Sequence, residues 1–190
     1  MDFDSAKCVC GAVYQAPQTD ILEMIGDSAL AQSFSGGESG TPHTAIYTTK
    51  DKVFDSVTVS GDYPAGSSAT YSQTYGTTVG QMTKNNSITL TLNGYAGKKI
   101  KSISMSMHSN NSSGTGKFSL VAGSTTIAAI NSNTGFNQPA WNGAWSSSFV
   151  TITPVMTNAN YTIGASEDVV LTITASTNSL FFQSLSVTWE

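Results

Sequence analysis

The two histidines are the side chains of this sequence that could most readily act as a catalytic base. His43 lies in a Gly-rich connecting stretch, and His108 ends a predicted strand before an Asn/Ser/Gly loop. Nucleophilic catalysis needs a nucleophile held beside such a base, and no G-x-S-x-G sequence accompanies either histidine. An isolated loop histidine is more often solvated than catalytic, so the sequence favours a solvated role for both.

The carboxylates form no recognisable catalytic pair. Glycosidases use two carboxyl groups that face one glycosidic bond. Twelve acidic residues are spread over the chain, and Glu167-Asp168 is the only adjacent pair. Adjacent residues on a strand point to opposite faces, so these two would not flank one bond. We therefore expect a protein that is not an enzyme, with a glycosidase built from distant carboxylates as the alternative left open.

Cys8 and Cys10 are the only cysteines. A zinc site needs four ligands and more often has C-x₂₋₄-C spacing. The pair is also too close for an easy unstrained disulfide, so reduced thiols are predicted. The sequence has no phosphate-binding glycine loop and no acidic calcium loop, so no cofactor is expected. A structural calcium held by backbone carbonyls stays open.

The segment WNGAW is the most suggestive local cluster, because Trp141 and Trp145 flank the turn signal Asn142-Gly143. Exposed aromatic rings can stack on sugars or anchor protein interfaces. The other interpretation is that both indoles pack over an end of the domain. We expect this loop to project both rings and to make the main external contact. Tyr71 and Tyr75 share parity on one predicted strand and have the same alternatives.

Charge and hydropathy exclude two classes of partner. Eight basic residues and a net charge of −4 provide no phosphate-neutralising patch, so nucleic acid is not expected. No stretch approaches the ~20 apolar residues of a membrane span, so no membrane insertion is expected. The segment Met1–Cys10 has two aspartates and no apolar core, a pattern unlike a signal peptide.

Most of the chain alternates apolar and hydroxyl residues with period two, as in the run SITLTLN from Ser87. Such alternation is typical of strands with one buried and one wet face. Serine (28) and threonine (25) replace charged residues, which make up only 11% of the chain. The alternation predicts these buried core residues: Ile88, Leu90, Leu92, Ile103, Met105, Phe118, Leu120, Leu171, Ile173, Leu185 and Val187. Near the end of the chain, it places Phe181 and Trp189 on the same face as Leu185 and Val187.

The predicted fold is all-β, a two-sheet β-sandwich of jelly-roll type. Its strands are expected at 44–49, 53–59, 69–75, 87–92, 102–108, 117–122, 125–130, 148–153, 160–164, 168–175 and 180–189. A slip in the alternation between Ile100 and Ile103 suggests a bulge or the start of a strand. Gly123-Ser124 fits a type II′ hairpin turn.

The N-terminal part differs from the rest. Residues 1–43 are predicted to form an arm and linker, and residues 44–190 the sandwich domain. Asp20 and Glu23 fit a capping box, and Ile21, Met24 and Ile25 fall on one face of the short helix that would follow. We expect this arm to be a docking element.

The segments SITLTLNGYAGKKIKSISMSMHSN (87–110) and TASTNSLFFQSLSVTWE (174–190) resemble the all-β modules of Bacteroidetes surface and secreted proteins. The resemblance covers about the last hundred residues. It implies a galactose-binding-like jelly roll, often a non-catalytic sugar-binding or adhesive part. Such modules normally follow a signal peptide or lipoprotein start, whereas proteins of a phage that infects such bacteria need none.

Two functional expectations follow. The first is a structural or adhesive virion component, such as a capsid decoration, head fibre or tail-associated protein, anchored by its arm to neighbouring subunits or forming a homo-oligomer. The second is a carbohydrate-binding module, extracellular or on a cell surface, with a glycan as its partner.

Overall fold

The structure is a computed structural model that describes residues 40–50, 57–74, 76–135, 138–142 and 146–190. The compact unit that contains both sheets runs from Pro42 to Glu190. The arm residues Ile21, Met24 and Ile25 and both cysteines lie outside the described residues, so the predicted helix and docking role stay predictions.

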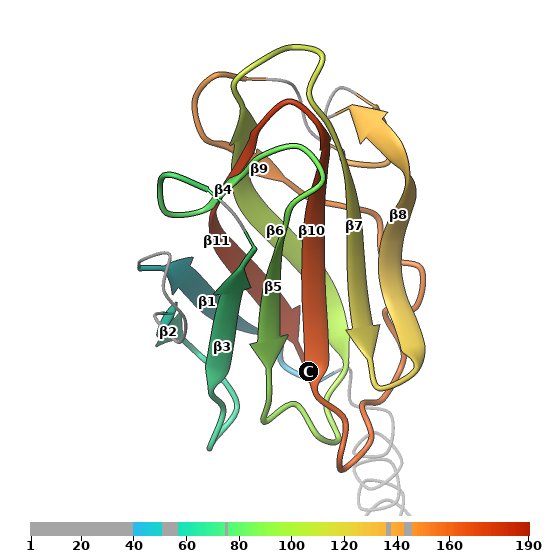
Figure 1. The fold of residues 1–190 in the computed structure, drawn as a ribbon. Coiled ribbons are helices and arrows are strands. Elements are labelled where there is room, and N and C mark those ends of the chain that lie inside the picture. Colours follow the sequence, from blue (N-terminus) through green and yellow to red (C-terminus); the bar gives the residue numbers. More distant parts are fainter. Residues whose placement is uncertain (1–39, 51–56, 75, 136–137, 143–145) are drawn as a thin grey trace, which may run out of the picture. The chain divides into compact units, whose positions relative to one another are not determined.

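The described chain is all-β and forms two antiparallel sheets that pack face to face (Figure 1). Sheet A contains β1 (His43–Thr49), β2 (Val57–Gly61), β4 (Gln81–Met82), β6 (Ile100–Ser109), β9 (Val150–Ile152) and β11 (Leu180–Trp189). Sheet B contains β3 (Ala69–Gln73), β5 (Ser87–Leu92), β7 (Thr115–Ala122), β8 (Thr125–Gly135) and β10 (Val169–Thr177). The predicted β-sandwich is confirmed.

The strand order explains how distant segments meet. Sheet A runs β2-β1-β11-β6-β9, with β4 also pairing with β11, and sheet B runs β3-β5-β10-β7-β8. The first and last strands of the sandwich are therefore neighbours. From β5 onward the chain passes repeatedly from one sheet to the other. Most strands that pair with each other are therefore far apart in the sequence.

The core lies between the sheets and is filled by the apolar half of each alternation. All eleven residues predicted to be buried are buried. They face inward because Thr and Ser occupy the intervening outward positions, where a β-branched side chain packs on the pleat and its hydroxyl reaches water. Each of these core side chains stabilises the sandwich through its loss of contact with water.

Irregularities in the pairing correct the sequence prediction at the last strand. The register of β11 against β6 shifts between Phe182 and Ser184, which leaves Gln183 as an extra residue. An inserted residue moves everything before it to the other face. Phe182 is therefore buried in the core, whereas Phe181 lies on the outer face; its predicted placement with Leu185 was wrong.

The bulge predicted near Ile100 is confirmed, because the register shifts between Thr188 and Trp189 opposite Lys101. The hairpin between β7 and β8 is also confirmed, with Gly123 at a φ of 54°. Ser124 has no positive φ, which fits the type II′ turn.

One predicted strand is wrong, and one was missed. Residues 160–164 form no strand: they are irregular apart from a single bridge between Lys99 and Thr162. The Tyr161 amide donates to the Asn158 carbonyl oxygen and so closes a turn at the start of this segment. The two-residue strand β4 is too short to show a periodicity. Several strand ends differ by one or more residues from their predicted limits.

A buried polar pair crosses the core. The hydroxyls of Tyr47 and Tyr95 lie 2.6 Å apart, and both side chains have no exposed surface. Changing Tyr47 to Phe is expected to lower the free energy of unfolding by about 1–3 kcal/mol, because the Tyr95 hydroxyl then stays buried without its partner. The double change of both to Phe should cost less than the sum of the single changes, and urea unfolding of the three variants measures this. Additive losses would contradict the pairing.

The same pair predicts a loss of stability at alkaline pH. Burial raises the pKa of Tyr95 well above its usual range and also raises the pKa of Tyr47. Since the folded state holds both phenols neutral, their contribution is complete below the ordinary pKa of 10.0 and falls as the pH rises above it. Unfolding midpoints measured from pH 8 to 11 should fall above pH 10, and fall less in the double Phe variant.

Candidate functional site: surfaces of the sandwich

Trp141 does not project from the surface, so its predicted role as an exposed contact is wrong. The side chain is fully buried and is the largest of the fully buried side chains among the described residues. Its Nε1 donates a hydrogen bond to the Thr134 carbonyl oxygen at 2.9 Å, and its ring lies 6.2 Å from that of Phe118. Asn142 is exposed in a left-handed turn with a φ of 47°, whereas Trp145 lies outside the described residues.

Gly116 of β7 lies beside both Leu180 and the Trp141 ring, and the missing side chain mainly makes room for Leu180. A Cβ on Gly116 of β7 would lie 3.4 Å from the Trp141 ring and 2.7 Å from Leu180. Glycine inside a strand often marks such a close approach. The Gly in TGKFSL was therefore a sequence signal that a bulky group packs against β7.

Tyr71 is also buried, so it is not an exposed contact residue. It is 1% exposed, and its hydroxyl donates a hydrogen bond to Gln73 at 2.5 Å. Because β3 is half-buried, the inward parity of Tyr71 places its ring in the core. Tyr75 lies outside the described residues.

His108 lies on the outer face of sheet A within an aromatic row. Its ring stacks on that of Phe181 at 4.2 Å and meets Phe149 edge-on at 4.6 Å. Its Nδ1 is buried and meets no hydrogen-bond partner of normal geometry in the part of the chain that the structure describes. Burial lowers the pKa of His108, which favours the neutral ring. These apolar neighbours orient no nucleophile toward the ring.

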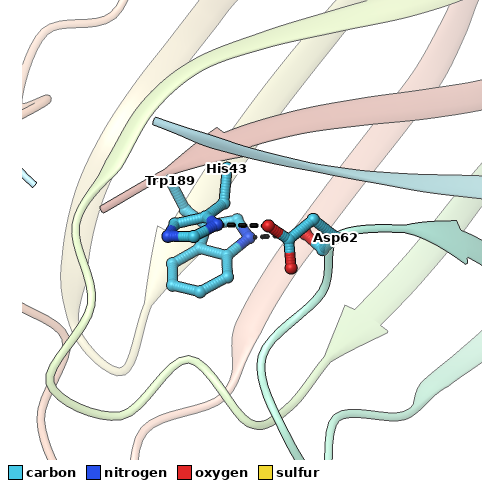
Figure 2. A network of polar contacts seen from close by, with 3 residues as sticks. All are labelled: His43, Asp62 and Trp189. Carbon is cyan, nitrogen blue, oxygen red and sulfur yellow. Dashed lines mark hydrogen bonds and ion pairs between the residues drawn. The ribbon is translucent and has the colours of Figure 1, made fainter. Parts of the chain in front are cut away.

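His43 lies in a polar cluster with Asp62 and Trp189, as Figure 2 shows. The ring stacks on Trp189 at 4.4 Å, and its Nδ1 pairs with the Asp62 carboxylate. Trp189 Nε1 donates to the Asp62 carbonyl oxygen at 3.0 Å, and the Lys98 ammonium lies 5.0 Å from the indole centroid. A histidine–aspartate pair can position a base, but here the third partner is an indole. The group therefore ties β1, the segment after β2 and the end of β11 together.

Glu167 is engaged in holding a turn. Its carboxylate accepts hydrogen bonds from the Tyr161 hydroxyl at 2.9 Å and from the Gly164 amide at 2.7 Å. Asp168 is exposed beside it. Among the described residues, no three His, Cys, Asp or Glu side chains are grouped as a metal site would require.

Most outward side chains in the central strands of sheet B are hydroxyls, which we call the hydroxyl lattice; Val121 and Val170 are exceptions. Ser72, Thr89, Thr172 and Ser119 form one transverse row across four strands. Neighbouring strands are about 4.8 Å apart, so these hydroxyls lie close together. Lys117 is the only charged residue among the outward positions of β5, β7 and β10.

An open hollow of about 340 Å³ lies on this face between β10, β7 and β8. Its polar lining consists of Lys117, Ser119, Asn131, Thr172 and Thr174. The sequence did not predict this site, because the alternation that produces it is also the ordinary pattern of a strand with one solvent-exposed face.

The comparisons with known proteins add no function. The sequence matches no protein-family model, and no curated protein is significantly similar to it. In the part of the chain that the structure describes, no helix is long and apolar enough to cross a membrane.

Proposed function

We propose that this protein is a non-catalytic adhesive β-sandwich that binds other macromolecules through its outer faces. The observation that carries the proposal is the hydroxyl lattice of sheet B, with its hollow and its single lysine. Hydroxyls and amides suit a saccharide, whose own hydroxyls both donate and accept hydrogen bonds. A saccharide is therefore the partner that these residues favour.

The candidate catalytic side chains support a non-catalytic role. His43 packs on Trp189, His108 lies between Phe149 and Phe181, and Glu167 holds a turn. Each has a structural partner in the place where an enzyme would need a nucleophile or a second carboxylate. Purified protein should show no hydrolysis of glycosides, esters or peptides above background.

The second candidate is a structural subunit of a larger assembly, such as a phage virion. The outer face of sheet A favours it, because Phe149 is 43% exposed and Ile46 is 39% exposed on this face, where His108 and Phe181 also lie among Ser and Thr. Exposed apolar groups of this kind suit contacts with neighbouring subunits.

A glycan array and mass photometry separate the two candidates. Binding of a defined set of glycans by a monomer would support saccharide adhesion. A concentration-dependent oligomer with no glycan signal would support the assembly role. Saccharide adhesion would be rejected by an array without any signal above background.

A further inference from the structure

The hollow on sheet B results from a bulge in the edge strand. Gly116 pairs with Thr134 and Phe118 pairs with Ile130, so three residues of β8, 131–133, lie opposite Lys117 alone. Extra residues bend a strand and pull it from its neighbour. All three are exposed, and β8 lies at the edge of the sheet beside β7 (Figure 1).

The polar groups around the hollow are free to bind a ligand. Within the described residues, the side chains of Lys117, Ser119, Asn131, Thr172 and Thr174 form no hydrogen bond. Other hydroxyls of the same sheet are already paired, such as Thr115 with Thr177 at 2.9 Å. A ligand at the hollow would therefore gain hydrogen bonds without breaking any within the protein.

Charge narrows the ligand class. Lys117 has no ion-pair partner among the described carboxylates, whereas Lys101 is paired with Glu190 at 3.6 Å. One ammonium surrounded by uncharged donors and acceptors complements one carboxylate on a hydroxyl-rich molecule. The volume of about 340 Å³ is at the lower end of ligand sites, which suits a short saccharide.

We propose that the hollow binds a carboxylate-bearing sugar unit of the hexuronate class. Lys117 pairs with the sugar carboxylate, and Asn131, Ser119 and Thr172 contact the ring hydroxyls. This inference rests on the proposed saccharide adhesion and assigns the site and the charge of its ligand.

Calorimetric titration of the full chain with trigalacturonate and with its methyl ester tests the proposal. The acid should bind about tenfold more tightly than the neutral ester, and Lys117→Ala should remove that preference. Thr172→Val, which keeps the β-branched shape, should weaken binding of both ligands. Raising the salt concentration should weaken the binding of the acid and leave the binding of the ester unchanged.

Two control variants match these changes. Lys84→Ala removes an equal charge at an exposed position outside the hollow. Thr91→Val removes a hydroxyl of β5 that lies on the outer face of sheet B but does not line the hollow. Both should bind like the wild type. Circular dichroism melting verifies that each variant is folded.

The outcomes separate this inference from the proposed function. Equal binding of acid and ester, or equal effects at the hollow and at the control positions, would overturn the hexuronate site. Failure of both ligands to bind would overturn it too, and any signal on the glycan array would still leave saccharide adhesion standing. A blank array would remove both proposals.

Discussion

Replacing Trp141 with Ala is expected to lower the free energy of unfolding by about 3–5 kcal/mol. The indole is fully buried and lies against Phe118 and beside Gly116. Its removal loses apolar burial, leaves a cavity and frees the Thr134 carbonyl from its 2.9 Å hydrogen bond. Urea unfolding followed by circular dichroism measures the loss.

Trp141→Phe is the matched control. Phenylalanine keeps part of the ring contact but cannot donate to Thr134, so an intermediate loss is expected. A loss below about 1 kcal/mol for Trp141→Ala would show that the side chain is not part of the core.

Gly80→Ala is expected to lower the free energy of unfolding by about 3–5 kcal/mol, more than a usual substitution at the surface does. Gly80 has a φ of 72°, where a Cβ is strained. A Cβ there would also overlap the Phe182 carbonyl oxygen, which cannot move without disturbing β11. The 2.9 Å hydrogen bond from the Phe182 amide to the Gly80 carbonyl would be distorted as well.

Gly97→Ala separates the strain of a positive φ from the steric overlap with β11. Gly97 has nearly the same φ, 74°, but a Cβ there meets nothing within 4 Å. Its expected cost is the conformational part alone, about 1–2 kcal/mol. Equal losses of unfolding free energy for Gly80→Ala and Gly97→Ala would mean that overlap with β11 adds nothing to the cost at Gly80.

The sequence was sufficient for the fold class and for the core because both depend on a local periodicity. In Ser87–Leu92 and in residues 171–174 the alternation is uninterrupted, and each apolar residue faces inward. A register shift is different, since it depends on how the partner strand is placed. Phe181 and Phe182 are equally apolar, and only the bulge at Gln183 decides which of them is buried.

The surface contacts were harder to predict than the core. Trp141 lies among polar residues and has no periodic signal of burial, yet it is buried against Phe118 and donates a hydrogen bond to the Thr134 carbonyl oxygen. The hollow forms where β8 bulges away from Lys117, and it involves residues from three strands. Such a site depends on long-range pairing, which local sequence patterns do not specify.

An amide NMR titration with trigalacturonate tests adhesion through the outer face of sheet B. The shifts are expected to be concentrated on β7, β8 and β10 around Lys117, Ser119, Asn131, Thr172 and Thr174, with His43, Asp62 and Trp189 unaffected. Shifts centred on another part of the surface, or none at ligand concentrations that saturate a weak site, would contradict adhesion through the outer face of sheet B.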